Sequence, residues 1–546
     1  MPGLDLGPPQ DENLFSKTSR SRITEELIYI AAIDIGTNST HLLIAEVDPV
    51  LKTFSIKLAE KSTTRLGERD SLTGSLTDVA INRGIEVLKS FKDLAESYKV
   101  ETILTAATSA VREAPNGKIF LEQVKSEVNL DIEIISGTEE ARLIYLGVIS
   151  GMEFGDKPHI LIDIGGGSTE LILADDDDSR ALTSTKVGAV RLKRDFLNSK
   201  TISKQRVEFL KTFIEGSLEP SVDKILHRLN PSKKPVIVAT SGTAMAIGSM
   251  IISEESGPKL KLQGYRISKT KLDQVIHKIL KMSPQEIEKF TSLSKRRSEI
   301  IIPGALILQT SIEMLGIDEI VLSERALREG LVVNWMLRNG FLQDRLSLQG
   351  NIRKRTVLHQ AKRFAVNTHR AKRVAKIALR IYDSTYGSLH EDQGDGRDLL
   401  WAASMLHACG QHINLSGYHK HSWYLIRHGE LLGYSHLEHL MVAGIARYHR
   451  KNFPKKRHEA WQCLENRHNR KIVYEMSIIL RLAASLDRRP EPAIESIEVN
   501  VDTSGILLRL VPVKIDQNIG LEQWSLKNAL MMIKDYVKVP INIQVD

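Results

Sequence analysis

The sequence predicts an α/β protein whose first part is a duplicated domain, followed by an all-α domain and a small α/β domain. Three observations support this fold class. Strand-like and helix-like segments alternate from residue 28 onward, a pattern typical of sheets covered by helices. One motif of 13 residues occurs twice, and the later window 341–490 differs in composition, being rich in basic residues and histidine.

The composition excludes several classes of protein. Hydrophobic residues make up 42% and charged residues 26% of the 546 residues, which is ordinary globular usage and indicates several domains. No run of about 18 apolar residues is present, so no membrane-spanning helix is predicted. The first residues lack the apolar stretch of a secretory signal, and Cys409 and Cys463 are too few for a disulfide framework. We therefore expect a cytoplasmic protein without membrane partners.

The elements of the first copy follow from hydrophobic periodicity and turn residues. A flexible tail is expected over 1–27, and Thr77 is a candidate N-cap of the first long helix. In order, the predicted elements are strands over Leu27–Ile35, Leu42–Val47 and Thr53–Leu58, a helix over Thr77–Lys99, a strand over Thr102–Ala107, a helix over Asn116–Val128, a strand over Asp131–Ile135 and a helix from Thr138. The strand Ile160–Ile164 starts a second copy, so the lobes are predicted as 28–145 and 146–340.

A repeated motif indicates the duplication directly. Residues 33–45 read IDIGTNSTHLLIA and residues 162–174 read IDIGGGSTELILA, with eight of 13 positions identical at an offset of 129 residues. Solenoid repeats have periods of roughly 20–50 residues, so a duplicated domain explains the offset better. We expect two related lobes that face each other over a cleft.

Each copy of the motif places small residues and hydroxyls in a sharp turn between two strands. Glycine permits positive φ and has no Cβ, so backbone N–H groups can approach an anion, and Ser168 and Thr169 add hydroxyl donors. Two such turns would clamp a phosphoryl chain between the lobes. For either copy alone, a tight β-hairpin without a ligand is the alternative. No GxxxxGK[ST] sequence is present, which excludes a P-loop.

The two copies differ in their carboxylates. His41 of the first copy corresponds to Glu170 of the second, and Asp163 is expected to face Glu170 across the hairpin. Carboxylates beside phosphate oxygens need a cation between them, and Mg²⁺ typically binds through one or two carboxylates plus phosphate. These residues therefore indicate a divalent-metal site on one side of the cleft.

Glu140 is a third acidic candidate. It lies with Glu139 in the first turn of a helix that Ser136 or Thr138 can cap. Acidic residues at a helix N-terminus also interact favourably with the helix dipole, so a purely structural role is the alternative for this pair.

Longer segments, in order along the chain, resemble one enzyme family. The two hairpins together with TRLGERDSLTGSLTDVAINRGIEVL, ATSAVREAPNG, ISGTEEARLIYLGV, KVGAVRLKRDF, TSGTAMAIG and SERALREG are similar to the exopolyphosphatase / guanosine pentaphosphate phosphohydrolase (Ppx/GppA) family. The resemblance extends through WAASMLHACGQHINLSGYHKHSWYLIRHGEL and covers roughly residues 28–490. It implies the two-lobed, duplicated core of the sugar kinase–actin superfamily, and the long members imply a homodimer.

The resemblance also implies a role for each matching residue. Glu140 matches the base that activates the attacking water, and Asp163 and Glu170 match the carboxylates that hold a divalent metal, expected as Mg²⁺. Arg112 and Arg65 are expected to contact phosphate, with a surface ion pair as the alternative for either. A monovalent cation such as K⁺ is compatible with the resemblance. The phosphate loops would consist of Asp34, Gly36, Thr37, Asn38 and Ser39 in the first copy and of Gly165, Gly166, Gly167, Ser168 and Thr169 in the second.

The window 341–490 contains 26 basic and 12 acidic residues and 13 of the 17 histidines, a composition that attracts a polyanion. The predicted helical domain, 341–495, resembles the HD phosphohydrolase fold. Ala408 follows His407 where the metal dyad requires Asp, so no active second metal centre is expected. Basic tracks at 353–355, 455–457 and 488–489 could hold a long phosphate chain; a solvated basic face is the alternative.

Residues 496–546 are predicted as a small α/β domain without visible chemistry. Alternating apolar residues predict strands over Ile497–Val501, Ile506–Val511 and Val539–Ile543, around a helix near Leu526–Tyr536.

The expected reaction is in-line attack of water on a terminal phosphoryl group, releasing orthophosphate from inorganic polyphosphate. Guanosine pentaphosphate (pppGpp) is the alternative substrate within the family. A kinase of the same superfamily would use both hairpins on ATP, although Glu140 favours activation of water. A protein that only binds polyphosphate or nucleic acid is a further alternative. No specific nucleic acid is expected as a partner, because aromatic residues are not interleaved with the basic ones.

Overall fold

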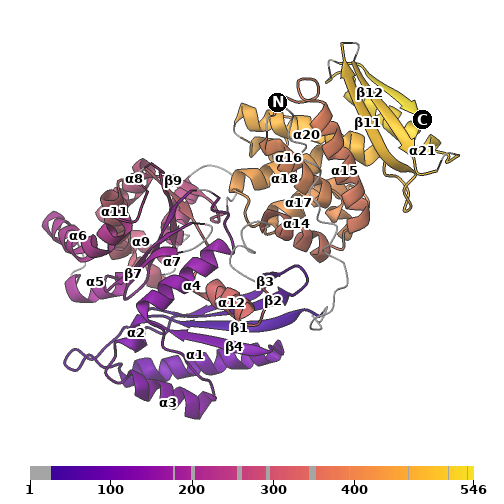
Figure 1. Cartoon of the computed structure of the whole chain (residues 1–546). Helices are drawn as coiled ribbons and strands as arrows, with labels where there is room; N and C mark the ends of the chain where they lie inside the picture. The colour runs from indigo at the N-terminus through magenta and orange to yellow at the C-terminus, as the bar shows by residue number, and fades with distance from the viewer. Residues whose placement is uncertain are drawn as a thin grey trace.

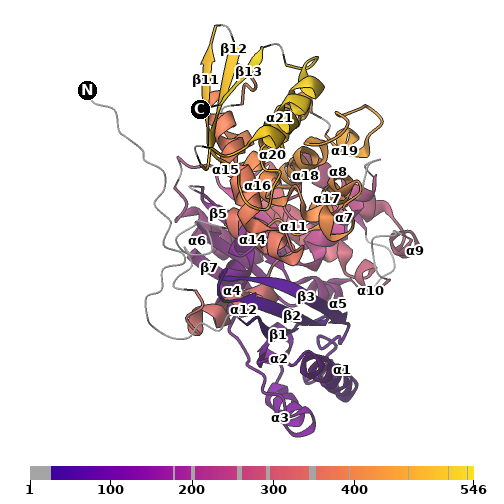
Figure 2. The same ribbon diagram turned by 90° about the vertical axis from the view of Figure 1, so that its right-hand side faces the viewer.

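The computed structural model describes residues 26–155, 157–175, 179–197, 203–230, 232–254, 261–289, 295–342, 352–392, 394–464, 466–503, 505–514, 516–537 and 539–545. The tail predicted over 1–27 lies outside the described residues except for Glu26 and Leu27. Within these ranges the chain forms two α/β lobes, a helical domain and a C-terminal sheet. The helical domain lies between the lobes and that sheet (Figures 1 and 2).

The first lobe contains a four-stranded sheet in the order β3-β2-β1-β4. Strand β1 (Ile28–Ile35) pairs antiparallel with β2 (Thr40–Asp48) and parallel with β4 (Thr102–Ala107), while β3 (Thr53–Ser62) forms the edge beside β2. Helices α1 (Asp78–Ser97) and α3 (Gly117–Val128) pack on one face of this sheet, with the short α2 (Ser109–Arg112) after β4. The predicted N-cap of α1 is confirmed, since the Thr77 hydroxyl accepts from the Ala80 N–H.

The prediction of a regular strand over Asp131–Ile135 is wrong. This segment runs beside β4 but forms only one bridge, between Ala107 and Ile134. The hydroxyl of Thr105 donates to the Asp131 carbonyl at 2.7 Å and accepts from the Glu133 N–H at 3.2 Å. A side chain therefore makes two of the bonds that a backbone ladder would otherwise supply.

The second lobe repeats the pattern of the first in a six-stranded sheet, in the order β7-β6-β5-β8-β10-β9. Strand β5 (His159–Ile164) pairs antiparallel with β6 (Thr169–Ala174) and parallel with β8 (Val236–Thr240), as β1 does with β2 and β4. This equivalence confirms the duplication that the sequence predicted. The remaining elements are β7 (Ser179–Thr185), α5 (Ala189–Phe196), α6 (Lys204–Leu226), α7 (Ser241–Glu254), β9 (Arg266–Ser268), α8 (Lys269–Lys281), α9 (Pro284–Glu288), α10 (Lys295–Ser298), α11 (Ile301–Leu315) and β10 (Glu319–Leu322).

Helices α4 (Gly137–Ile149) and α12 (Leu327–Arg338) lie between the two sheets and share one core with strands of both. Two glycines let these helices approach each other closely. A Cβ on Gly147 would lie 1.9 Å from the Ala326 carbonyl oxygen, and one on Gly330 would lie 1.8 Å from the Leu143 carbonyl oxygen. Because α4 runs through the predicted boundary at 145/146, the two lobes are joined by a continuous helix.

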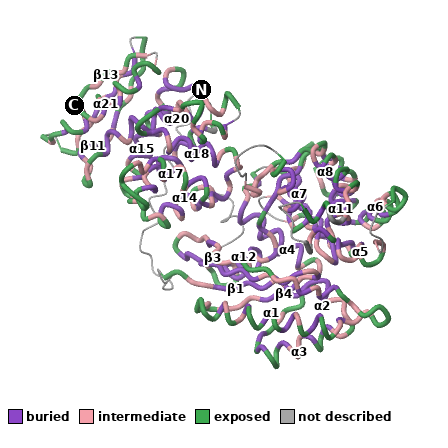
Figure 3. Tube along the Cα trace, turned by 180° about the vertical axis from the view of Figure 1, so that it is seen from behind, coloured by how far each residue is buried: buried purple, intermediate pink, exposed green. Residues whose placement is uncertain are grey.

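The helical domain and the C-terminal sheet share a single hydrophobic core. The helices are α14 (Ile352–Arg363), α15 (Thr368–Ser384), α16 (Asp395–Leu406), η2 (Cys409–His412), α17 (Tyr418–His428), α18 (His436–Tyr448), α19 (Glu459–Gln462) and α20 (Arg467–Ser485). The sheet has the order β11-β12-β13, formed by β11 (Ile494–Asp502), β12 (Gly505–Pro512) and β13 (Ile541–Val545). Helix α21 (Gly520–Ile533) begins six residues earlier than predicted. Buried stretches run along β1 and through the helical domain (Figure 3).

None of the helices in the described ranges is both long and apolar enough to cross a membrane.

Candidate active site

The two glycine-containing turns adopt the same local structure. In the first, the Gly36 N–H donates to the Ser39 carbonyl at 3.1 Å; in the second, the Gly165 N–H donates to the Ser168 carbonyl at 2.9 Å. The strands around them pair in the same register, so that Asp34 lies opposite His41 and Asp163 lies opposite Glu170. The expected pairing of Asp163 with Glu170 across the hairpin is therefore confirmed.

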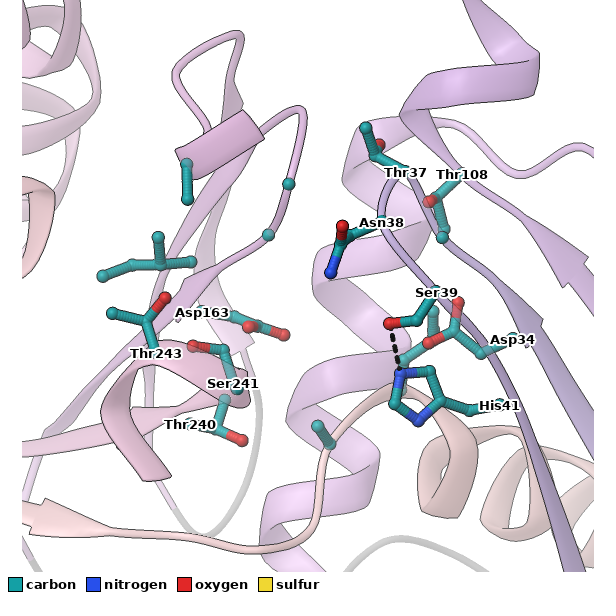
Figure 4. Close-up of a pocket in the computed structure, with 18 of the residues that line it drawn as sticks. Asp34, Thr37, Asn38, Ser39, His41, Thr108, Asp163, Thr240, Ser241 and Thr243 are labelled. Atoms are coloured by element: carbon teal, nitrogen blue, oxygen red, sulfur yellow. Dashed lines mark hydrogen bonds between the residues drawn. The ribbon is translucent and has the colours of Figure 1, made fainter. Parts of the chain in front are cut away.

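Both turns border one cavity of about 300 Å³ between the lobes. Figure 4 shows Asp34, Thr37, Asn38 and Ser39 of the first hairpin facing Asp163 and Thr240–Thr243 of the second lobe across this space. The predicted site residues that line it are Asp34, Gly36, Thr37, Asn38, Ser39, Glu140, Asp163, Gly165, Gly166, Gly167, Ser168 and Glu170.

The tips of the two hairpins also touch each other, which explains why positions 166 and 167 are glycines. A Cβ on Gly166 would lie 2.9 Å from the Thr37 Cβ, and one on Gly167 would lie 2.3 Å from the Ser109 Oγ. Real Cβ atoms are not found at such distances from fixed backbone or short side chains. Glycine at these positions allows the two phosphate-loop candidates to meet at one edge of the cavity.

Three predicted site residues do not line the cavity. Thr169 is fully buried, and its hydroxyl donates to the Val187 carbonyl at 2.6 Å. Arg65 forms ion pairs with Glu68 at 3.2 Å and Glu299 at 3.3 Å. Arg112 does not line the cavity, but its guanidinium contacts Glu140, which does.

The two glutamates at the start of α4 have different surroundings. The Ser136 hydroxyl caps the helix by accepting from the Glu139 N–H, which selects Ser136 from the two predicted caps. Glu139 pairs with Arg142 at 2.7 Å and does not line the cavity. Glu140 is 8% exposed, lines the cavity and accepts from Arg112 Nη1 at 3.1 Å. The structure thus assigns the structural role to the first glutamate and leaves the second one available for chemistry.

Four of the carboxylates that line this cavity are predicted site residues, and burial raises the pKa of each. Burial and then the Glu140 charge raise the pKa of Asp34 to about 7, and burial and then the Asp34 charge raise the pKa of Asp163 to about 7. Burial raises the pKa of Glu140 to about 7, although Arg112 opposes the shift. Burial, then Glu140 and Asp163, raise the pKa of Glu170 well above its usual range. The nearby guanidinium groups of Arg112 and Arg328 oppose these shifts without cancelling them.

A group of cations lines the cavity as well, and it was missed as a group from the sequence. It consists of Lys61 on β3, Arg297 on α10 and Arg328 on α12, beside His41. Burial, then Arg297 and Arg328, lower the pKa of Lys61 to about 8, as expected for neighbouring positive charges. Burial followed by Arg328 and Lys61 keeps the His41 imidazole neutral by lowering its pKa. A cluster of cations on the wall of a cavity attracts an anion.

The N-termini of α7 and α12 also face the cavity, through Ser241–Thr243 and Ala326–Arg328. Helix N-termini favour anions because their first N–H groups have no partner within the helix. Ser241 has a positive φ of 89°, and its buried Oγ makes no hydrogen bond within the described part of the chain. A strained residue with an unpartnered hydroxyl at this position is typical of a ligand-binding site.

The chemistry of the carboxylates fits a divalent cation. Within the described residues, no group of three or more His, Cys, Asp or Glu side chains is arranged to hold a metal ion. Mg²⁺ does not require such a group, because it commonly binds through one or two carboxylates together with water and substrate phosphate. Asp163 and Glu170, which face each other across one hairpin, supply a pair of this kind.

Mg²⁺ is expected to stabilise the protein through these carboxylates. At pH 8, Mg²⁺ at a concentration of 100 times its Kd should raise the free energy of unfolding by about 2.7 kcal/mol. Asp163→Asn removes one buried charge, so we expect this variant to unfold at a higher temperature than the wild type without Mg²⁺, and to gain little from the ion. Thermal unfolding with and without Mg²⁺ measures both effects. An equal rise in unfolding temperature on addition of Mg²⁺ in the two proteins would mean that the ion binds elsewhere.

His407 and His449 of the helical domain are buried, and no group of three or more metal-ligating side chains occurs in the described ranges. The rings of His407 and His449 are in contact at 5.1 Å between centroids, and each Nδ1 bonds a backbone carbonyl of its own helix. Asp487 pairs instead with Arg370 and Arg373, both at 2.8 Å. Two guanidinium groups therefore neutralise the Asp487 carboxylate.

Comparison with known proteins agrees with this geometry. Residues 32–339 match the Ppx/GppA phosphatase family, and residues 352–529 match domain III of Ppx/GppA phosphatases. The chain is 28% identical over 484 residues to guanosine-5'-triphosphate,3'-diphosphate pyrophosphatase of Vibrio vulnificus, covering 88% of this chain and 91% of that protein. The protein of the same name from Vibrio parahaemolyticus is 29% identical over 469 residues, covering 85% and 88%.

A solved structure supports the same conclusion for the two lobes. The crystal structure of an exopolyphosphatase from Cytophaga hutchinsonii is similar with a TM-score of 0.53 and 25% identity, covering 57% of this chain and 98% of that one. The architecture is the duplicated, actin-like phosphatase core that the sequence predicted, followed by a helical domain and a small α/β region. With both domains matched in order along the chain, this protein belongs to the Ppx/GppA phosphatase family.

Proposed function

We propose that the protein is an exopolyphosphatase, which removes the terminal orthophosphate from inorganic polyphosphate. The observation that carries this proposal is the division of charge in the cavity. Burial and their mutual charges raise the pKa values of Asp34, Glu140, Asp163 and Glu170, and the same cavity is lined by a cationic group of Lys61, Arg297 and Arg328. The carboxylates suit a metal and a water, and the cations suit the remaining phosphates of a chain.

In this proposal Glu140 is the general base. A base works best when its pKa lies near the operating pH, and burial raises the pKa of Glu140 to about 7. Arg112 donates to Glu140 Oε2 at 3.1 Å and to the Ile135 carbonyl at 2.8 Å, so it fixes the carboxylate relative to the start of α4. The free oxygen of Glu140 can then accept the proton of the attacking water.

The hairpins would bind the phosphoryl group that is removed. Backbone N–H groups at Gly166 and Gly167 and hydroxyls of Thr37, Ser39 and Ser168 border the cavity and can donate to its oxygens. Asp163 and Glu170 would hold Mg²⁺, which when bound supplies positive charge to the phosphate oxygens and orients water. The cations and the N-termini of α7 and α12 would bind the next phosphates.

A pppGpp 5'-phosphohydrolase is the second candidate, favoured by the names of the two Vibrio relatives. Both substrates present a terminal phosphoanhydride, so the same carboxylates and hairpins would serve either. We favour the polymer because the window 341–490 carries 26 basic against 12 acidic residues, which a long polyanion explains better than a compact nucleotide does. A kinase is less well supported, because Glu140 lies where water would be activated.

The discriminating experiment is phosphate release, with Mg²⁺, from long-chain polyphosphate and from pppGpp at equal concentrations of terminal phosphate. We expect kcat/KM for polyphosphate to be at least about tenfold higher, a difference of roughly 1.4 kcal/mol in transition-state stabilisation. Higher kcat/KM for pppGpp would assign the second candidate function. Absence of phosphate release from both would exclude the hydrolase, and phosphate transfer from ATP would then be measured.

A further inference from the structure

The loop between β10 and α12 is part of the cavity wall, with one exception. Ser323, Glu324, Ala326, Leu327 and Arg328 all line the cavity, whereas Arg325 does not. The Arg325 side chain is 3% exposed and points in the other direction, into the contact between the lobes and the helical domain. A buried guanidinium is costly unless it is paired, so its partners decide whether this loop conformation is stable.

Three separate segments surround the Arg325 side chain. Its Nη1 donates to Ser150 Oγ at 3.0 Å, and its Nη2 donates to Glu430 Oε1 at 2.8 Å. The guanidinium lies over the Phe54 ring at 4.6 Å. Gly151 makes room for it, because a Cβ there would lie 2.7 Å from the Arg325 Cδ. Glu430, which comes from the helical domain, is the only carboxylate among these partners in the described structure.

The backbone of Arg325 is attached to the catalytic lobe at the same time. Its carbonyl accepts from Ser323 Oγ at 3.0 Å and from Thr240 Oγ1 at 3.3 Å, and its N–H donates to Ser323 Oγ. Thr240 ends β8 and lines the cavity itself. Although burial opposes it, Arg325 keeps the pKa of the Glu430 carboxyl below its usual range, so the pair is charged at neutral pH.

Other contacts join the helical domain to the lobes, but in the described ranges they end on residues away from the cavity wall. Lys362 pairs with Asp48 at 2.7 Å, Arg355 donates to the Lys52 carbonyl at 3.2 Å, and the Gly433 N–H donates to the Gly151 carbonyl at 3.3 Å. Asp48, Lys52 and Gly151 are not among the residues that line the cavity.

We propose that Arg325 is a positioning residue through which the helical domain, by way of Glu430, holds the loop 323–328 and Arg328 at the catalytic cavity. This rests on the proposed function only in taking that cavity as catalytic. Removal of the Glu430 charge leaves a buried guanidinium without a carboxylate, which favours rearrangement of the loop. Arg328 would then bind substrate less well, whereas Glu140 and the hairpins would be unaffected.

The test compares Glu430→Gln with Lys362→Gln, which breaks an ion pair of the same interface that has no link to the cavity loop. Tripolyphosphate is the substrate, because a chain of three phosphates keeps contacts outside the cavity to a minimum. For Glu430→Gln we expect KM to rise about tenfold with kcat within about twofold, as loss of a charged hydrogen bond predicts. Glu430→Asp, which retains the charge, should recover most of the loss, and Lys362→Gln should behave as the wild type.

Hydrogen–deuterium exchange supplies a readout independent of activity. In Glu430→Gln, amides of 323–328 should exchange at least about tenfold faster than in the wild type and in Lys362→Gln. The proposal is overturned if Glu430→Gln changes neither KM nor exchange in this loop, or if Lys362→Gln changes both equally. A wild type without phosphatase activity would contradict the proposed function alone, since the exchange comparison would still decide whether Glu430 orders the loop.

Discussion

Glu140→Gln is expected to lower kcat for phosphate release about 10³-fold, within the range that a general base contributes. The substitution keeps the size of the side chain and an oxygen that can accept from Arg112 Nη1, which lies 3.1 Å from Glu140 Oε2 in the wild type. The fold and the cavity should therefore be retained. KM should change little, because the glutamine still fills the same wall of the cavity. Initial rates of phosphate release from polyphosphate, measured with Mg²⁺, give both constants.

Glu139→Gln is the matched control for that variant. Glu139 is the preceding residue of the same helix turn, but it accepts from Arg142 at 2.8 Å and 2.7 Å and does not line the cavity. Its kcat should stay within about twofold of the wild type, since an exposed ion pair contributes about 1 kcal/mol or less to stability and nothing to the reacting atoms. Equal losses in the two variants would contradict the assignment of Glu140 as the base.

Gly330→Ala is expected to destabilise the two lobes by about 3 kcal/mol, the upper range for overpacking of a well-packed interior. The new Cβ would lie 1.8 Å from the Leu143 carbonyl oxygen, which belongs to the backbone of α4 and cannot rotate away. Helix α12 must therefore move from α4, and Arg328 at its start must move with it. Urea unfolding followed by circular dichroism measures the loss of stability.

The control for this variant is Gly216→Ala, a substitution in another helix of the same lobes. Gly216 lies on the exposed face of α6, where a Cβ would have no atom within 4 Å. Alanine should stabilise this helix by about 0.5–1 kcal/mol, because it has the higher helix propensity. A comparable loss of stability in both variants, or none in Gly330→Ala, would show that the close contact between α4 and α12 is not required.

Local features of this protein could be predicted from the sequence because they depend on neighbouring residues. The two hairpins, the cap at Thr77 and the pairing of Asp163 with Glu170 each involve segments close in the chain, where period and turn residues decide the structure. The segment Asp131–Ile135 was predicted wrongly because the hydroxyl of Thr105, more than 25 residues away, replaces part of the backbone ladder.

Which side chains share the cavity could not be decided in this way. Lys61, Arg297 and Arg328 belong to three elements far apart in the sequence, and only the packing of the lobes brings them together. No local pattern distinguishes Arg297 within its basic run from a solvated residue. Likewise, Arg112 was expected on phosphate, but the fold directs it to Glu140, and Thr169 is directed into the core.

The sequence by itself determined the duplication, the alternation of strands and helices, and the two turns whose glycines leave backbone N–H groups accessible. Tertiary structure alone decided that Glu140 rather than Glu139 faces the cavity, that the four predicted carboxylates share it with a cationic group, and that Arg325 connects its wall to Glu430. The physical reason is the separation in sequence over which each kind of interaction acts. Turn geometry and periodicity act over a few residues, whereas burial and charge interactions depend on elements that the chain brings together over hundreds of positions.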